Sequence, residues 1–378
     1  MRKLFNLVKT STNSRARAGI IHFNGINIET PVFMPVGTLG SVKAVDHRNL
    51  IETDFKIILG NTYHLYLRPG NEVMNHFGGL HKFINWDRAI LTDSGGYQVF
   101  SLSDLRKITE DGVRFQSHID GSYHLFSPEN VIETQRILGS DIVMVLDECT
   151  PYPSEYKYAK DSMDLSLKWA QKSRNAFDNS STRWGRDQFL FGIGQGSMYK
   201  DLRKSYVQQM VDIGFDGYAI GGLSVGEPAD MMYEMVDVCT AEIPEESPRY
   251  LMGVGTPENI LEAIELGIDM FDCVLPTRNA RNGQLFTSKG KINIKNAKYK
   301  FSNDCIDENI NAYASNNFSL GYLRHLYISG EILALQLGSQ HNLAFYKWLV
   351  VTAREKILTD DYRQWKLEIL NAMNQEII

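Results

Sequence analysis

The sequence predicts an α/β protein, namely a (β/α)8 TIM barrel with a C-terminal helical subdomain packed on it. Three observations support this prediction: short apolar runs recur along the chain, longer mixed stretches separate them, and a helical pattern begins after Asn303. We expect the catalytic barrel to span residues 1–300 and the helical subdomain residues 301–378. The length of 378 residues would also allow two separate domains.

The expected barrel strands are about eight short apolar runs, most of them followed by a polar residue or a glycine. Buried runs separated by helix-length segments are typical of parallel strands joined by crossover helices. A doubly wound sheet is the alternative, but no GxGxxG motif follows the first run, which disfavours its dinucleotide-binding form. The runs are 32–36, 57–59, 89–91, 142–146, 189–193, 218–220, 250–252 and 270–274.

Two helix starts between these runs are clear. Ser127 can cap a helix that has Pro128 and Glu129 in its first turn, and Thr256-Pro257-Glu258 repeats that arrangement. Near the C-terminus, residues 318–351 have apolar side chains at helical spacing, and residues 348–370 continue the pattern with charged residues on the other face.

Composition restricts the class of protein. The net charge of -6 argues against a general nucleic-acid coat protein. No apolar run approaches the roughly 20 residues that span a bilayer, and no secretory signal follows Arg2 and Lys3. The four cysteines show no CxxC spacing, which disfavours a disulfide framework. We therefore expect a cytoplasmic protein that does not bind membranes.

Polar residues follow several of the expected strands, at the positions where active sites of such barrels lie. They are Asp93, Asp147, Gln195, Gly221, Gly222, Gly253 and Asp272. Asp93 leads into a turn with two glycines and Tyr97, whose ring could stack on a planar ligand. An Asp-capped turn before a helix is the alternative explanation of this segment.

The other two carboxylates stand in apolar surroundings. Asp147 and Glu148 follow one strand and should point to opposite sides, so that only one needs to face a site. Asp272 lies inside an apolar run, where an ionised carboxylate is costly unless it is paired or used. Such a carboxylate could attack a sugar anomeric carbon, and a second one could move protons, as in retaining glycosyl transfer. A buried aspartate bound to backbone donors remains the alternative.

A basic segment begins beside Asp272. Residues 273–303 contain no acidic residue and seven basic ones, which favours contacts with phosphates over an ordinary solvated surface. Together these features predict a barrel that acts on a nucleotide glycosidic bond. The basic residues are Arg278, Arg281, Lys289, Lys291, Lys295, Lys298 and Lys300.

From about Phe5 to Arg363 the chain resembles the tRNA-guanine transglycosylases, specifically the bacterial queuosine-type enzymes. The resemblance is carried by residues 92–98 (TDSGGYQ), 221–227 (GGLSVGE), 251–257 (LMGVGTP) and 271–281 (FDCVLPTRNAR). It implies a (β/α)8 barrel with a C-terminal subdomain. It also implies exchange of the wobble guanine of GUN-anticodon tRNAs for 7-aminomethyl-7-deazaguanine by retaining double displacement, a step of queuosine biosynthesis.

The resemblance also implies residue roles. Asp272 matches the nucleophile and Asp93 the general acid/base. Base recognition is implied for Asp147, Gln195 and Gly222, stacking for Tyr97 and Met252, and further substrate binding for Ser94, Gly95, Gly96 and Leu223. The implied RNA-binding residues are Gly253, Val254, Gly255, Thr256, Pro257, Glu258, Asn259, Thr277, Arg278, Asn279, Ala280 and Arg281.

The choice of base and the partners are further implications. Val225 and Cys149 resemble the bacterial pattern, whereas the eukaryotic enzymes, which accept the bulkier queuine, carry glycine at the position of Val225. The expected partners are tRNA, a 7-deazaguanine base and a second copy of the chain in a homodimer. One small departure is that Gln195-Gly196-Ser197 replaces the usual QGG.

The larger departure concerns zinc. The family usually shows CxCxxC and then a histidine, but the matching positions here are Ile310, Ala312, Ser315 and His341. A tetrahedral zinc site needs four ligands, and only His341 offers one. We therefore expect no cofactor and no metal, with apolar packing through Ile310 and Phe318 in place of zinc.

Two other functions remain possible from the sequence. A barrel glycoside hydrolase could use Asp272 and Asp93, but it would need tryptophans near the strand ends and no basic segment, and no tryptophan directly follows a catalytic strand. A non-catalytic tRNA-binding subunit would have no need of reactive carboxylates.

Overall fold

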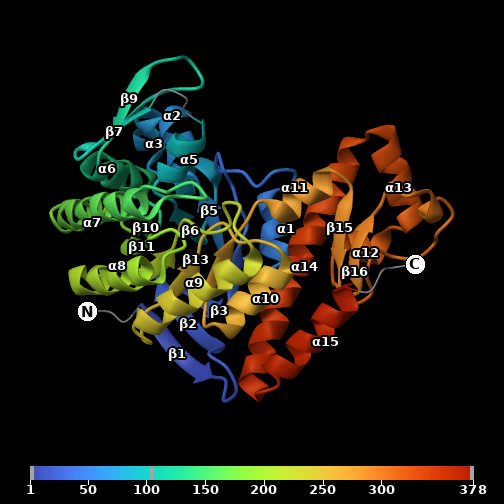
Figure 1. Cartoon of the computed structure of the whole chain (residues 1–378). Helices are drawn as coiled ribbons and strands as arrows, with labels where there is room; N and C mark the ends of the chain where they lie inside the picture. Colours follow the sequence, from blue (N-terminus) through green and yellow to red (C-terminus); the bar gives the residue numbers. More distant parts are fainter. Residues whose placement is uncertain (1–3, 103–105, 375–378) are drawn as a thin grey trace.

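A closed barrel of eight parallel strands forms the centre of the computed structural model, which describes residues 4–102 and 106–374 (Figure 1). The strand order is β4-β14-β13-β12-β11-β10-β6-β5. The first and last strands of this order meet where Val36 bridges Leu59, and the N–H of Leu59 donates to the carbonyl of Pro35 at 2.9 Å. The predicted (β/α)8 barrel is therefore confirmed.

Each barrel strand overlaps one of the eight predicted runs. Nearly every residue in them is buried, because the strands face the barrel interior on one side and helices on the other. Their bounds are β4 (Val32–Met34), β5 (Ile57–Gly60), β6 (Ala89–Thr92), β10 (Ile142–Met144), β11 (Phe189–Gly194), β12 (Gly217–Ile220), β13 (Arg249–Leu251) and β14 (Met270–Asp272).

Helices connect these strands and surround the barrel. Both predicted helix starts are confirmed: Ser127 forms a capping box with Asn130, and the Thr256 side chain accepts from the N–H of Asn259. The connecting helices are α1 (His47–Glu52), α2 (Thr62–Leu67), α3 (Asn71–Phe77), α4 (Leu80–Ile84), α5 (Gly96–Leu102), α6 (Pro128–Leu138), α7 (Tyr156–Asp178), α8 (Lys200–Ile213), α9 (Ala229–Glu242), α10 (Pro257–Glu265) and α11 (Leu275–Arg281).

Three antiparallel additions were not predicted from the sequence. The sheet of β1 (Phe5–Thr10), β2 (Arg17–Phe23) and β3 (Ile26–Thr30) lies below the barrel in Figure 1, and Arg17 forms a buried ion pair with Asp269 just before β14. The sheet of β7 (Arg106–Thr109), β8 (Gly112–Gln116) and β9 (Tyr123–Phe126) is inserted between β6 and α6. The hairpin of β15 (Gln284–Thr287) and β16 (Gly290–Asn293) follows α11. Most of these strands are partly exposed and carry polar or charged residues, so they lack the continuous apolar run of a barrel strand.

The C-terminal region is helical as predicted, but its pattern is interrupted twice. Gly330, with a φ of 73°, ends α13 (Leu320–Ser329) before α14 (Ile332–Thr359), and Asp360 separates α14 from α15 (Tyr362–Asn374). Before them lie the short 3-10 helix η1 (Ala297–Tyr299) and α12 (Tyr313–Asn317).

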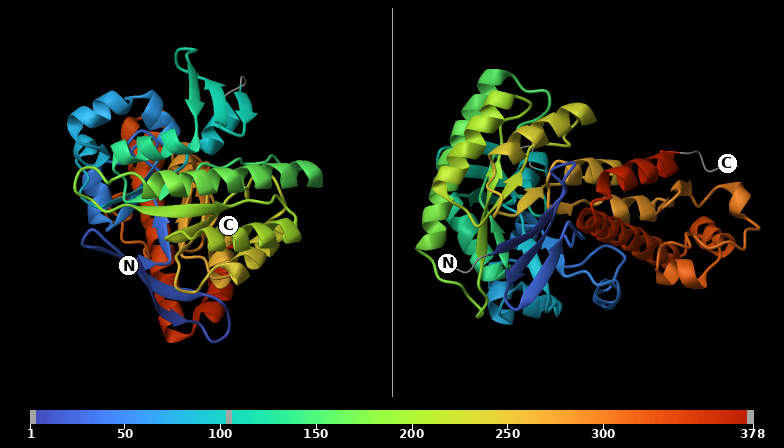
Figure 2. Two further views of the ribbon diagram at one scale, coloured as in Figure 1. Left: turned by 90° about the vertical axis from the view of Figure 1, so that its left-hand side faces the viewer. Right: turned by 90° about the horizontal axis from the view of Figure 1, so that it is seen from below.

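Helix α14 ties this region to the barrel. Its Arg354 donates to the carbonyls of Gly19 and Thr30, and Tyr346 donates to the carbonyl of Gly255. The main hydrophobic core therefore contains α14 residues together with the barrel, while a second core lies among residues 280–337. Figure 2 shows the segment of residues 280–337 projecting to one side of the barrel. The domain division at residue 300 stays a prediction. No helix within residues 4–102 and 106–374 is long and apolar enough to cross a bilayer.

Candidate active site

A cavity of about 390 Å³ lies at the carboxyl ends of the barrel strands. Every polar strand-end residue that the sequence singled out lines it: Asp93, Asp147, Gln195, Gly221, Gly222, Gly253 and Asp272. Parallel strands in a closed barrel end at the same rim, so residues separated by up to 180 positions meet in one place.

Asp272 ends β14 and is held by two donors on one oxygen. The Tyr250 hydroxyl donates to Oδ1 at 2.6 Å, and the N–H of Gly253 donates to the same atom at 2.8 Å. Within the described part of the chain, Oδ2 has no hydrogen-bond partner. Burial raises the pKa of Asp272 above its usual value, although these two hydrogen bonds act in the opposite direction. The carboxylate is thus fixed in orientation with one oxygen free to react.

Asp93 lies after β6, and its carboxylate accepts three hydrogen bonds. The Asn61 and Gln98 amides donate to Oδ2 at 2.6 and 2.7 Å, and the N–H of Thr62 donates to Oδ1 at 2.7 Å. Burial, with a smaller contribution from the nearby charge of Asp272, raises the pKa of Asp93 to about 6, although these donors act in the opposite direction. A carboxyl that titrates near neutrality can both give and take a proton.

Asp147 links two other residues that are predicted to bind substrate. Its Oδ1 accepts from the Ser94 hydroxyl at 2.9 Å, and its Oδ2 accepts from the Gln195 amide at 2.6 Å. Burial raises the pKa of Asp147 to about 6. Glu148 points away, as predicted, and accepts a hydrogen bond from Tyr158 at 2.8 Å. Oε1 of Gln195 is buried without a partner among the described residues, as a group that waits for a ligand would be.

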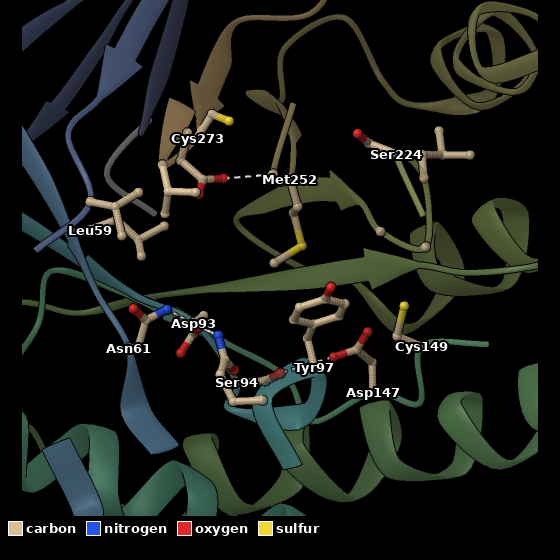
Figure 3. A pocket seen from close by; sticks show the side chains of 18 of the residues that line it. Leu59, Asn61, Asp93, Ser94, Tyr97, Asp147, Cys149, Ser224, Met252 and Cys273 are labelled. Atoms are coloured by element: carbon tan, nitrogen blue, oxygen red, sulfur yellow. Dashed lines mark hydrogen bonds between the residues drawn. The ribbon is translucent and has the colours of Figure 1, made fainter. Parts of the chain in front are cut away.

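The remaining residues predicted to bind substrate are Tyr97, Met252, Leu223, Gly95 and Gly96. Figure 3 shows the Met252 side chain facing the ring of Tyr97 across the cavity, and the Tyr97 side chain is 55% exposed. Leu223 lines the cavity, whereas Gly95 and Gly96 do not. A Cβ on Gly96 would come within 2.5 Å of the Asp147 carbonyl, so this position needs glycine for the turn to approach Asp147.

Most of the residues predicted to contact RNA lie outside the cavity. Gly253 lines it, the rest of residues 253–259 lead into the first turn of α10, and residues 277–281 lie on α11, directly after β14. Glu258 pairs with Lys291 at 3.1 Å. Of the seven basic residues in the segment, all except the partly buried Arg281 are exposed, on α11, the β15–β16 hairpin and the following turn.

Sequence reasoning missed three residues that hold the two central carboxylates. Asn61 comes directly after β5, so the rule applied to the other strand ends could have found it. Gln98 belongs to the motif that contains Asp93, and Tyr250 lies inside a predicted strand. For these last two residues only the hydrogen bonds reveal the role.

The positions that match the family's zinc ligands form a different kind of contact. Ile310 and Ala312 are buried in the main hydrophobic core. The Ser315 hydroxyl lies 3.0 Å from Nδ1 of His341, and Nε2 of His341 lies 2.7 Å from the Phe286 carbonyl. Burial lowers the pKa of His341 to about 4, which keeps the ring neutral. These residues do not fit a zinc ion, since three of the four lack a ligand atom suited to zinc and both nitrogens of the fourth are engaged.

Comparison with known proteins agrees with this geometry. A family model described as Queuine tRNA-ribosyltransferase matches residues 11–375. The chain is 55% identical over 366 residues to the queuine tRNA-ribosyltransferase of Caldanaerobacter subterraneus subsp. tengcongensis, covering 97% of this chain and 96% of that protein. It is 53% identical to that of Desulforapulum autotrophicum, covering 96% and 97%, and 49% identical to that of Vibrio atlanticus, covering 97% and 96%. The chain therefore belongs to the queuine tRNA-ribosyltransferase family.

Proposed function

We propose that this protein is a tRNA-guanine transglycosylase of queuosine biosynthesis, a pentosyltransferase that exchanges a guanine base in tRNA. The observation that carries the proposal is the way in which the Asp272 carboxylate is held in the cavity. Two donors hold one of its oxygens, while the other is free in a cavity that also contains Asp93 and a stacking pair. A glycoside hydrolase would share the two carboxylates, but the family membership and the basic segment beside Asp272 favour tRNA.

In the first displacement, Oδ2 of Asp272 attacks the anomeric carbon of the wobble guanosine. The bond from that carbon to N9 of guanine breaks, its electron pair stays on the base, and the acid form of Asp93 supplies a proton to the leaving guanine. The sugar is then held to Asp272 by a covalent ester, which keeps the tRNA bound while the bases exchange.

In the second displacement, the incoming base loses its N9 proton to the Asp93 carboxylate and attacks the same carbon. The bond to Asp272 breaks and the carboxylate is restored. Two inversions at one carbon retain its configuration. No nucleotide triphosphate is needed, because one glycosidic bond replaces another.

The incoming base that we propose is 7-aminomethyl-7-deazaguanine. Val225 and Cys149, whose identities resemble the bacterial pattern, both line the cavity. Asp147 offers carboxylate oxygens to the N–H edge of a guanine-like base, and the ring of that base would lie between Tyr97 and Met252. We further predict that the exchange takes place at the wobble position of GUN-anticodon tRNAs. We also predict that the protein is a homodimer and that it is cytoplasmic.

The deciding experiment measures incorporation of labelled guanine into unmodified tRNA. The wild-type protein should incorporate label, and 7-aminomethyl-7-deazaguanine should compete with the labelled base and remain in the tRNA. A protein that binds tRNA without incorporating label would instead be the non-catalytic subunit. Hydrolysis of a carbohydrate without exchange would point to the glycoside hydrolase.

The kcat/KM for guanine, which reports the second displacement, should fall as the pH drops through about 6. Burial raises the pKa of Asp93 to about 6, so the carboxylate form of Asp93 is present above this pH and is lost below it. Protonated Asp93 cannot accept the N9 proton of the incoming guanine. The measurement is kcat/KM for labelled guanine between pH 5 and 8, and a profile that stays flat through pH 6 would contradict the prediction.

We also propose that the protein folds and acts without zinc. The apolar burial of Ile310 and Ala312 supports this proposal, as do the hydrogen bonds of His341 to Ser315 and Phe286. Metal analysis of purified protein should find zinc well below one equivalent per chain, and a chelator should leave the melting temperature unchanged. A stoichiometric zinc content, or melting that depends on the chelator, would overturn the proposal.

A further inference from the structure

Arg203 on α8 is a completely buried arginine that touches neither of the proposed catalytic carboxylates. We propose that it is a positioning residue for base specificity: its guanidinium holds the backbone behind the base-binding site so that the N–H groups of Gly222 and Leu223 face the base. This inference rests on the proposed function and adds a specificity-determining residue to it.

The guanidinium reaches the ends of two neighbouring barrel strands. Its Nε donates to the Ser197 carbonyl at 2.8 Å, and Nη1 donates to the carbonyls of Gly194 at 3.2 Å and Gly221 at 2.7 Å. Nη2 donates to the Gly222 carbonyl at 3.1 Å. One rigid, planar group therefore fixes four carbonyls. One belongs to the last residue of β11, one follows that strand, and two follow β12.

Fixing a carbonyl also fixes the N–H of the same peptide group. In a trans peptide the C=O and the N–H point in opposite directions, and neither the Gly221–Gly222 nor the Gly222–Leu223 bond is cis. Because Arg203 binds the Gly221 and Gly222 carbonyls, the N–H groups of Gly222 and Leu223 point away from Arg203. Both of these residues line the cavity.

These two N–H groups are available for a ligand. Neither has a hydrogen-bond partner within residues 4–102 and 106–374, although the next two N–H groups, of Ser224 and Val225, both donate to Glu227. Gly222 is only partly buried and Leu223 is buried, and a backbone N–H that lines a cavity without a protein partner can donate to an acceptor on a ligand. The 6-oxo group of guanine is such an acceptor, and adenine-like bases lack it.

Arg203 also holds the segment that carries Gln195. The carbonyls of Gly194 and Ser197 flank this residue, and the Gln195 side chain packs directly on Gly222: a Cβ there would come within 2.3 Å of its Oε1. The φ of +63° at Gly222 independently favours glycine. Arg203 thus sets the relative position of Gln195, which binds Asp147, and of the two N–H donors.

The charge of Arg203 has a direct effect on those donors. Arg203 forms no ion pair with a carboxylate among the described residues, so its positive charge is stabilised by the four carbonyl dipoles. A cation bound to a carbonyl polarises the peptide group and makes its N–H a stronger donor. A structural arginine that only filled space would have no such effect on base choice.

The test uses Arg203→Lys and Arg203→Gln, with Arg136→Lys as the matched control. Arg136 is also buried and donates to the Phe177 and Ser180 carbonyls and to Gln188, but none of these partners lines the cavity, whereas Gly221 and Gly222 do. The readout is the KM for labelled guanine, the inhibition constant of 2-aminopurine, which lacks the 6-oxo group, and the KM for tRNA. Melting temperatures report the cost in stability.

We expect both Arg203 variants to raise the KM for guanine by about tenfold, corresponding to a weakened hydrogen bond, with little change for 2-aminopurine and tRNA. Discrimination between the two bases should fall by the same factor. Arg136→Lys should lower the melting temperature without changing that discrimination. If the Arg203 variants lose stability and keep the wild-type discrimination, the role is merely structural and the proposal is wrong. Absence of exchange in the wild type would instead refute the proposed function.

A measurement on the wild-type protein covers the case in which both variants fail to fold. Hydrogen exchange should show the amides of Gly222 and Leu223 exchanging readily without base and becoming protected when guanine is added. Protection should be absent with 2-aminopurine. If guanine leaves these amides unprotected, they do not face the base and the proposal fails.

Discussion

Asp272→Asn should lower the rate of guanine exchange by a factor on the order of 10⁴ or more, as expected for loss of a nucleophile. The amide has no negative charge with which to attack the anomeric carbon and cannot form the ester. Asparagine is close in size, and Tyr250 and Gly253 can still donate to its carbonyl oxygen, so the fold should be kept. Label incorporation gives the rate, and a denaturing gel shows the tRNA–protein adduct of the wild type.

The control for this variant is Asp230→Asn, which removes an exposed carboxylate in the first turn of α9 that does not line the cavity. It should retain activity within about twofold, as substitutions at exposed positions usually do. An Asp272→Asn protein that still forms the adduct would show that another residue is the nucleophile. Residual exchange without adduct would indicate direct transfer between bases.

Asp93→Asn should slow exchange by about 10²- to 10⁴-fold, the usual contribution of a general acid/base. The amide cannot protonate the departing guanine or accept the N9 proton of the incoming base. The adduct should still accumulate on long incubation because Asp272 is intact. The loss of activity near pH 6 should change as well, since Asp93, whose pKa is raised to about 6, has been removed.

Asp87→Asn is the matched control, because Asp87 is exposed and lies just before β6, whereas Asp93 follows the same strand. It should leave both the rate and the pH profile unchanged. Unaltered exchange in Asp93→Asn would exclude this residue as the acid/base. The Asn61 and Gln98 amides that bind Asp93 would then have only a structural purpose.

The sequence by itself determined the barrel and the rim on which the site lies. Parallel strands covered on both faces must be apolar along their whole length, so runs such as 142–146 and 270–274 can be read directly. Barrel closure then brings the strand ends together, which is why the sequence alone predicts that Asp93, Asp147 and Asp272 lie close together. The caps at Ser127 and Thr256 were readable for a similar reason, since their hydrogen bonds reach only three residues along the chain.

Only the tertiary structure decided the antiparallel strands and the hydrogen bonds that hold the site residues in place. Sheet β7–β9 and hairpin β15–β16 have exposed edges and mixed faces, so no continuous apolar pattern marks them. The Tyr250 hydroxyl on Asp272, the Asn61 amide on Asp93 and the guanidinium of Arg203 on four carbonyls join residues from different elements. A hydrogen bond needs its two groups within about 3.2 Å and well aligned. No spacing along a chain specifies that separation, because it exists only once the barrel has closed.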